Sequence, residues 1–355
     1  MGMTDAVVFD GDESVGFYGN PSGFIQDTKR LTVNTYYTPW LVALVPGMNL
    51  AGADVVSAIG SRQAVGLRYS QFTAPQITGS VSNGITERYM QVNYAYNLSK
   101  SFNLGVAFKY VYSAFNNPIN SSQFEGQSIA GDIGLSYSND IPLSDLEVLY
   151  RAGLCINNLG SKISYSNSPG SDFLPTTLKL GNGVSTSIEI ADARLNINWI
   201  VQVQKLLVPT PPVYFPFNSG HPEIASGLNP NVGVVQGAMQ SFYDAPGYVS
   251  IDPNTSEFSV EKGSRFKEEL NEVALQSGIE QSIDFLDGKG GFTLRQGLFL
   301  EHQTKGNRKF VTLGSSIGLY GFELSSTLLL PITTASTILR TVFFQFGYRF
   351  TFDAA

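Results

Sequence analysis

The chain alternates apolar and polar residues in many short segments. In residues 101–114, large apolar side chains such as Phe102, Val106 and Phe108 alternate with small or polar ones, Lys109 included. Successive side chains of a strand point to opposite faces, so such a segment has one apolar and one polar face. The same split recurs along the chain and predicts fourteen strands, at 30–38, 50–59, 62–72, 88–98, 101–114, 127–138, 147–157, 176–187, 193–206, 270–283, 291–301, 308–319, 321–330 and 340–352.

Composition changes what these strands are expected to form. Charged residues make up 14% of the chain and aromatic residues 12%, whereas an ordinary soluble domain has roughly 25% charged residues. No run of about 18 apolar residues could form a spanning helix. A soluble all-β protein would expose the aromatic face of nearly every strand to water. We therefore expect an all-β protein, a 14-stranded antiparallel transmembrane β-barrel with a polar interior.

The connections between these strands alternate in length. Those after even-numbered strands are short and those after odd-numbered strands are mostly long, which is typical of an outer-membrane barrel with its long loops outside the cell. An even strand count returns the chain to its starting rim, so both termini are expected on the periplasmic side. We expect the barrel to cover residues 30–355, with a long extracellular loop at about 207–269.

The opening segment contains a glycine-rich turn, GFYGNPSGF. No helix follows it, as a phosphate-binding loop would require, and an alternating strand begins soon afterwards. We expect residues 1–29 to form an N-terminal plug inside the barrel, with glycines allowing tight packing and Asn-Pro fixing a bend. The expected turn residues are Gly16, Phe17, Tyr18, Gly19, Asn20, Pro21, Gly23 and Phe24. MGMTDAVVFD lacks the features of a secretory signal, so we expect the signal to be absent from this sequence.

Little in the sequence predicts catalysis. One cysteine, Cys155, and two histidines, His221 and His302, leave no recognisable metal or nucleophile motif, so no enzyme activity, cofactor or metal is expected. The net charge of −7 argues against nucleic acid as a partner. Inward-facing charges are expected to pair with one another or with the plug more often than to select a solute. They are Arg68, Lys109, Asp132, Glu147, Arg151, Lys179, Arg194, Glu272, Glu280, Arg295 and Arg349.

Two loops are candidates for partner binding. Residues 207–269 are rich in Pro, Gly and Asn and too long for a simple connection. The first loop, TPWLVALVPGMNL, places apolar residues at the outer rim, where they contact a partner or form an interfacial aromatic belt. The candidate partner-binding residues are Trp40, Leu41, Val42, Leu44, Pro211, Pro212, Tyr214, Phe215 and Phe217.

Several segments carry a resemblance to a known family. The opening MGMTDAVVFDGDESVGFYGNPSGF resembles the N-terminal segment of FadL-type outer-membrane barrels. YTPWL at 37–41, LRYSQF at 67–72, AGLCINNLGSKISY at 152–165 and FLPTTLKLGNGVS at 173–185 resemble the PorV/PorQ family of the type IX secretion system of Bacteroidetes. RFKEELNEVALQSGIEQ and LEHQTKGNRKFVTLGSSIGL add to the resemblance, which covers nearly the whole chain except the middle of 207–269.

The resemblance implies a FadL-like barrel that serves protein transport in the bacterial outer membrane. It implies binding of the C-terminal signal domains of type IX cargo, partnership with the SprA/Sov translocon, and a cargo shuttle to the PorU-containing attachment complex. Outer-membrane lipid and lipopolysaccharide would surround it. Two alternatives remain: a FadL-type channel for hydrophobic small molecules, and a lipid A esterase, which would need a nucleophile beside His302 or His221.

Overall fold

The structure is a computed structural model of the 355-residue chain. It describes residues 3, 19–26, 30–39, 47–74, 84–116, 123–143, 146–166, 170–191, 193–215, 223–251, 258–286, 288–332 and 341–353.

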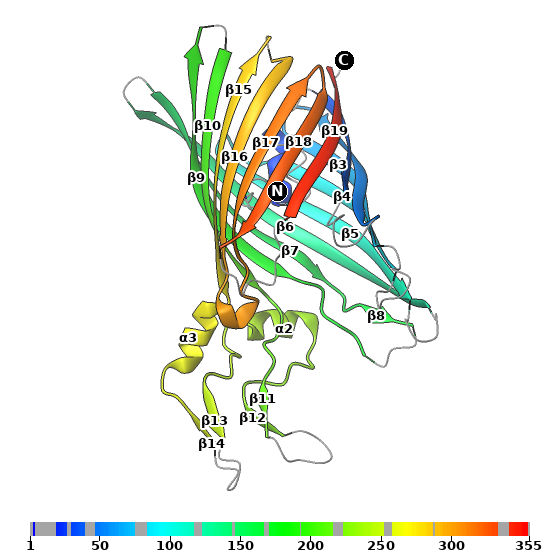
Figure 1. Ribbon diagram of the computed structural model, residues 1–355, viewed down its shortest axis with the longest axis vertical. Helices are drawn as coiled ribbons and strands as arrows, with labels where there is room; N and C mark the ends of the chain where they lie inside the picture. Colours follow the sequence, from blue (N-terminus) through cyan, green and yellow to red (C-terminus); the bar gives the residue numbers. More distant parts are fainter. Residues whose placement is uncertain are drawn as a thin grey trace.

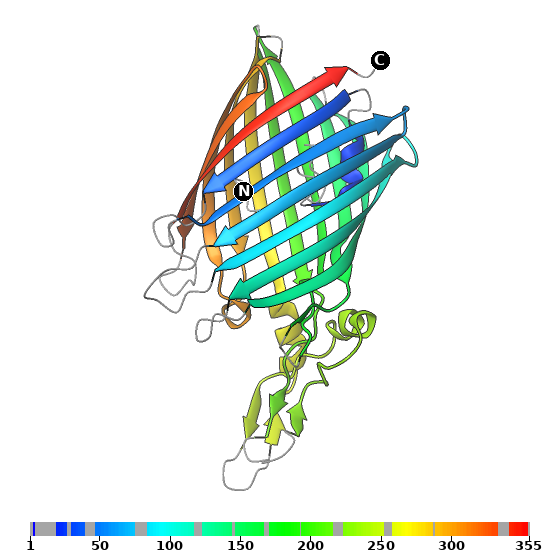
Figure 2. The same ribbon diagram turned by 90° about the vertical axis from the view of Figure 1, so that its right-hand side faces the viewer.

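Fourteen long antiparallel strands form a hydrogen-bonded ring (Figures 1 and 2). Each pairs with the next along the chain, and β1 closes the ring by pairing with β19, Arg30 opposite Asp353. The strands are β1 (Arg30–Pro39), β2 (Asn49–Ile59), β3 (Gln63–Ala74), β4 (Ile85–Asn97), β5 (Phe102–Asn116), β6 (Gln123–Leu143), β7 (Leu146–Gly160), β9 (Thr177–Ile190), β10 (Ala193–Leu206), β15 (Val273–Phe285), β16 (Gly290–Leu300), β17 (Lys309–Leu319), β18 (Phe322–Pro331) and β19 (Thr341–Asp353). The predicted fourteen-stranded antiparallel barrel is confirmed.

The wall has the two faces that the alternation predicted. In β4, Gln91 and Asn93 are buried inside the barrel. The alternate residues Val92 and Tyr94 are 53% and 39% exposed on the outer surface. Polar residues therefore fill the interior and large apolar residues cover the outside, the reverse of a soluble protein. Within the described residues, no helix combines the length and hydropathy that a membrane-crossing helix needs.

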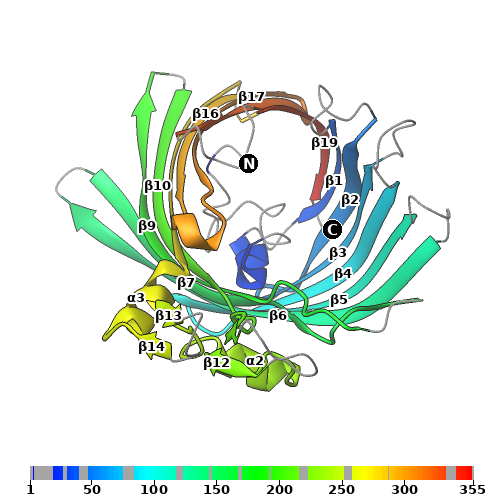
Figure 3. The same ribbon diagram turned by 60° about the horizontal axis from the view of Figure 1, so that its bottom comes forward.

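Residues 207–272, which we call the rim lobe, fold into a small unit at one end of the barrel (Figures 1 and 3). The end of β19 lies at the opposite end of the barrel (Figure 1). Its described residues form two short hairpins and two helices. These are β11 (Val213–Tyr214) with β12 (Ile224–Ser226), α2 (Val234–Gln240), β13 (Val249–Ile251) with β14 (Phe258–Val260), and α3 (Ser264–Asn271).

The predicted tenth strand begins too early. Residues 270 and 271 end α3, and β15 starts at Val273. Glu268, Glu269 and Glu272 recur at helical spacing and contact lysines of the barrel rim, which favours a helix over a strand here. The remaining short elements are η1 (Pro21–Gln26), η2 (Gln303–Lys305) and β8 (Ser164–Tyr165), which pairs with β6.

Candidate partner-binding surfaces and lumen

Ion pairs between neighbouring strands stabilise the inner wall. Arg68 Nη2 lies 2.9 Å from Asp54 Oδ1, with both side chains fully buried. Lys109 Nζ lies 2.7 Å from Asp132 Oδ2. Because an isolated buried charge is very costly, these pairs make the polar interior compatible with a folded wall.

Glu280 and Arg295 form a third pair, with 2.6 Å between Arg295 Nε and Glu280 Oε2. Thus four of the inward charges that the sequence indicated pair with one another as expected, and Arg68 pairs with Asp54, which the sequence had not indicated. Arg194 instead pairs with Glu189 at 2.6 Å, and both of these side chains are more than half exposed. Glu272 lies at the lobe, outside the wall.

The segment Gly19–Gln26 lies inside the barrel against the inner wall (Figure 3). Asn157 Nδ2 donates a hydrogen bond to the Gly19 carbonyl at 2.8 Å. Asn20 Nδ2 donates to the Leu135 carbonyl at 3.0 Å, and Asn20 Oδ1 accepts from the backbone and the hydroxyl of Ser22. The amide of Asn20 therefore both closes the turn and attaches it to β6.

Two glycines of the wall make room for this turn. A Cβ on Gly105 would overlap the backbone of Pro21 and Ser22, and one on Gly134 would overlap the side chain of Asn20. Glycine lets the turn approach the strands more closely than any other residue would.

The structure describes only part of the turn that was predicted for the plug. Gly19, Asn20, Pro21 and Gly23 are buried in the lumen, and the backbone of Phe24 belongs to η1. Gly16, Phe17 and Tyr18 lie outside the described residues. The plug of residues 1–29 as a whole stays a prediction.

Three glutamates of α3 and its end attach the rim lobe to the barrel. Lys205 Nζ, at the end of β10, lies 3.1 Å from Glu269 Oε2 and 2.5 Å from Glu272 Oε2. Lys305 Nζ, in η2, lies 3.0 Å from Glu268 Oε1 and 2.9 Å from Glu272 Oε1. Two lysines on separate rim segments thus share one helix, which fixes its position on the barrel.

The same carboxylates organise the interior of the lobe. Glu269 Oε1 accepts from the Ala245 backbone at 2.8 Å, and Glu268 Oε2 accepts from the Gly247 backbone at 2.7 Å. Thr210 Oγ1 donates to Glu272 Oε1 at 2.7 Å. The lobe is therefore one hydrogen-bonded unit and more than a long open loop.

The environment of these groups shifts their pKa values. Burial opposes ionisation of Glu272, but hydrogen bonds from Lys205, Lys305 and Thr210 outweigh it and lower the pKa of this carboxyl. Burial also opposes the charge of Lys305, yet Glu272 and Glu268 raise its pKa. Asp244 behaves differently, because burial raises its pKa. The ionised network therefore holds the lobe at neutral pH.

The outer surface of the lobe exposes large apolar side chains. They belong to α2 with the turn that follows it, and to α3. We call these six residues the lobe patch: Val235 (68% exposed), Met239 (65%), Phe242 (50%), Tyr243 (66%), Phe266 (71%) and Leu270 (56%). Large exposed apolar side chains on two helices of one small unit are typical of binding surfaces.

Four of the nine residues predicted for partner binding belong to the described part of the lobe. In the lobe, Pro211 is exposed, Pro212 is buried, Tyr214 is 40% exposed and Phe215 is half-buried. The others, Trp40, Leu41, Val42, Leu44 and Phe217, lie outside the described residues. The lobe patch itself was missed, although the positions 235, 239, 242 and 243 have helical i, i+4, i+7 and i+8 spacing that could have revealed it.

A cavity of about 400 Å³ lies at the base of the lobe. Its lining includes Phe173, Pro175, Pro209 and Pro230. Lys162 stacks over the Phe173 ring, with its Nζ 4.1 Å from the ring centroid. The cavity thus combines apolar side chains with one basic residue, Lys162, and one acidic residue, Asp172.

His302 has a structural role in the part of the chain that the structure describes. Its ring Nδ1 accepts from the Thr304 backbone at 3.3 Å and lies 2.9 Å from Thr304 Oγ1, so it caps η2. His221 lies outside the described residues. Among the described residues, no group of three or more His, Cys, Asp or Glu side chains is arranged to hold a metal ion.

Comparison with known proteins adds a family assignment. The family described as "Type IX secretion system protein PorV" matches residues 1–213, which is more than half of the chain. No curated protein matches the chain.

Several solved structures are similar to this chain. They include the toluene transporter TbuX of Ralstonia pickettii, with 10% identity, a TM-score of 0.45, and coverage of 95% of this chain and 93% of that one. A Pseudomonas aeruginosa FadL homologue has 9% identity and a TM-score of 0.46, with 98% and 96% covered. CdiB from Acinetobacter baumannii has 10% identity and a TM-score of 0.45, with 92% of this chain covered. The chain spans 60% of the length of that CdiB.

The family match and the barrel agree with the resemblance seen in the sequence. The family match includes the glycine-rich turn and the strands from β1 to β10. The chain therefore belongs to the PorV family of the type IX secretion system, as an outer-membrane β-barrel component of that system.

Proposed function

We propose that this barrel binds the C-terminal signal domains of type IX cargo and the SprA/Sov translocon, and that it carries cargo to the PorU-containing attachment complex. Membership of the PorV family supports a role in type IX secretion. The observation that carries the proposal is the lobe patch, six exposed apolar side chains on a unit fixed to the barrel rim.

The orientation follows from the same proposal. The rim lobe and the other long connections lie outside the cell, and both chain termini lie in the periplasm, with residues 1–29 as a plug in the lumen. The position of the lobe at the end of the barrel opposite to the end of β19 supports this arrangement (Figure 1). A partner would then meet the lobe patch at the cell surface.

The lobe is suited to binding because it is both apolar and fixed in place. Ordering a flexible loop on binding costs conformational entropy, and a segment that is already fixed avoids much of that cost. Phe242, Tyr243 and Phe266 supply large contact areas, which commonly dominate the energy of an interface. The nearby cavity lined by Phe173 and prolines has room for one apolar side chain of the partner.

A matched pair of variants on α2 tests the proposal. Met239→Glu places a charge in the lobe patch, whereas Gln236→Glu places the same charge on an exposed polar position of the same helix. The native protein and both variants are affinity-purified from outer membranes, and their partners are identified by mass. We expect Met239→Glu to reduce recovery of translocon and cargo by about tenfold, as a lost interface anchor would.

Gln236→Glu should retain both partners. Folding of each barrel is checked by its resistance to unfolding in detergent on gel electrophoresis. Full retention of translocon and cargo by Met239→Glu, also when combined with Phe266→Glu, would contradict the proposal.

No observation favours the alternative functions. The inner wall buries polar side chains such as Gln91, Asn93 and Asn157, which would hinder a path for hydrophobic small molecules. His302 caps a turn. We therefore propose a binding role without catalysis.

A further inference from the structure

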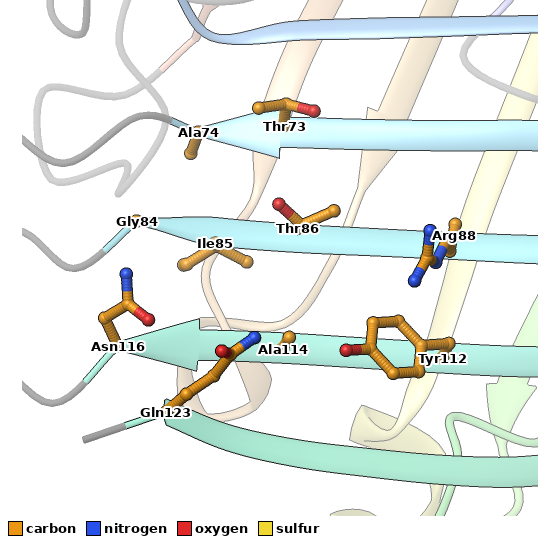
Figure 4. Close-up of a pocket in the computed structure, with 10 residues that line it drawn as sticks. All are labelled: Thr73, Ala74, Gly84, Ile85, Thr86, Arg88, Tyr112, Ala114, Asn116 and Gln123. Carbon is orange, nitrogen blue, oxygen red and sulfur yellow. The ribbon is translucent and has the colours of Figure 1, made fainter.

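A second cavity lies on the outer side of the barrel wall, at the same rim as the lobe (Figure 4). Its volume is about 320 Å³, and the ends of β3, β4, β5 and β6 surround it. The polar residues that line it are Thr73, Thr86, Arg88, Tyr112, Asn116 and Gln123.

Arg88 stands on the lipid-facing side of β4. It shares this face with Met90 and Val92, which are 52% and 53% exposed, while Gln91 and Asn93 on the other face are buried in the lumen. Arg88 is itself exposed. A cation on this surface is unusual, because the lipid-facing side of a barrel is otherwise apolar and a charge there is costly except near the interface.

Two tyrosines locate this position relative to the membrane. Tyr69 OH donates to Gln71 Oε1 at 2.7 Å, and Tyr110 OH donates to Gln127 Oε1 at 2.8 Å. In both cases the hydroxyl bonds to an outward-facing glutamine that lies one row nearer to the lobe end of the barrel than the tyrosine does. Tyrosines arranged in this way are typical of the membrane interface, with the ring in lipid and the hydroxyl among headgroups.

Arg88 lies on the headgroup side of these tyrosines. It pairs across the strands with Gln71 of β3 and with Tyr112 of β5. On the other side of the tyrosines, towards the middle of the barrel, the next row of outward residues is apolar. It consists of Leu67, Val92 and Phe108, all at least half exposed. The change from apolar to polar side chains therefore occurs at the tyrosine row, and the cavity opens at the level of the lipid headgroups.

The guanidinium of Arg88 is held in place but is not neutralised. Its Cζ lies 4.4 Å from the centroid of the Tyr112 ring, a cation–π contact that orients the group. Arg68 and Arg295 on the inner wall each pair with a carboxylate. Within the described part of the chain, no carboxylate pairs with Arg88, so its N–H donors are available to a ligand.

We propose that this cavity binds the phosphate group of a membrane lipid headgroup, with Arg88 as the anchoring cation. Arginine presents a planar set of donors that matches phosphate oxygens. The hydroxyls of Thr73 and Thr86 and the amides of Asn116 and Gln123 line the same space. The volume is about ten times the share of one water molecule in the liquid, which leaves room for a phosphate with part of its attached headgroup.

One acidic residue limits the charge that the site accepts. Glu125 is exposed on the same face of β6, opposite Ala114 of the cavity lining. Its carboxylate opposes anions, so the site suits a single phosphate better than a cluster of negative charges. Glu125→Gln should therefore strengthen binding.

The test uses the intact barrel in nanodiscs of phosphatidylcholine, with or without phosphatidylglycerol. Native mass spectrometry counts the lipids that the barrel retains. We expect retention of phosphatidylglycerol above phosphatidylcholine, a drop of about fivefold in Arg88→Gln, and an intermediate value in Arg88→Lys, since lysine carries the charge without the paired donors. A separate sample receives inorganic phosphate, and binding is followed by phosphorus NMR.

Lys309→Gln is the matched control. Lys309 lies at the lobe end of β17, where it pairs with Leu300, and it does not line the cavity. The substitution therefore removes a cation from the same rim without changing the cavity. Arg88-dependent retention of phosphatidylglycerol supports a lipid source, and Arg88-dependent binding of inorganic phosphate alone supports free phosphate as the ligand. Equal losses in Arg88→Gln and Lys309→Gln, or no loss in either, would overturn the proposal.

Discussion

The inner wall and the rim lobe use charge in opposite ways. On the wall, Arg68, Lys109 and Arg295 each face one carboxylate of a neighbouring strand. In the lobe, Lys205 and Lys305 each contact two glutamates of one helix and thereby join distant segments. The wall pairs neutralise charges on a structure that backbone hydrogen bonds already determine, whereas the lobe network itself determines where a helix lies.

The largest effect is expected from breaking a wall pair. Asp54→Ala leaves Arg68 buried without its carboxylate, which should lower the free energy of unfolding by about 3 kcal/mol. Urea unfolding of the barrel in lipid measures this change. Val55→Ala, at the neighbouring exposed position on the lipid-facing side, is the control and should cost much less. Equal losses in the two variants would show that the pair contributes nothing specific.

The second-largest effect is expected from disturbing the contact between the Asn20 turn and the barrel wall. Gly134→Ala forces a Cβ into the side chain of Asn20, and we expect a loss of about 2 kcal/mol together with faster hydrogen exchange at residues 20–23. Gly318→Ala on β17 is the control, since the nearest atom to its Cβ would be 3.7 Å away, an ordinary van der Waals distance. Unchanged exchange in Gly134→Ala would mean that the turn does not depend on this approach.

A smaller and pH-dependent effect is expected in the lobe. The pKa of Glu272 is lowered in the folded protein, so the stability that it contributes is present above its unfolded pKa and is lost as the pH falls through the folded value. Glu272→Gln should therefore loosen the lobe at neutral pH by about 1 kcal/mol after solvent screening, and should remove this acid dependence. Limited proteolysis of residues 261–272 across pH measures both.

Asp244 contributes the opposite dependence. Burial raises its pKa, so its protonation stabilises the lobe as the pH falls. The difference between wild type and Glu272→Gln mainly reports the Glu272 contribution, because Asp244 is present in both and the charge of Glu272 is the smallest of the causes that shift its pKa. Identical pH profiles for the two proteins would contradict the assigned role of Glu272.

The smallest effect is expected for an exposed pair of the wall. Arg194 and Glu189 are 2.6 Å apart, but both side chains are more than half exposed. Exposed pairs contribute little because water and salt screen them. Arg194→Gln should leave the unfolding transition of the barrel unchanged. A clear destabilisation would show that proximity, and not burial, decides the contribution of a charge pair here.

The sequence was most informative for the wall. Strand positions, faces and several inward charges followed from a period of two, because pairing with neighbours along the chain is local. The prediction of strand ends was less accurate, because the alternation of apolar and polar residues fades there. Strand β6 extends through Pro142 to Leu143, beyond the expected end at 138, because it continues to pair with β7.

The sequence by itself determined the barrel, its two faces and its family resemblance, since these depend on alternation along each strand and on short connections. Only the tertiary structure decided the form of the rim lobe, the turn between Asn20 and β6, and the cavity at Arg88. Lys305 lies 33 residues from Glu272, and Asn20 lies 115 residues from Leu135. No local pattern specifies such pairs, because their formation depends on the closed ring that brings distant strands together.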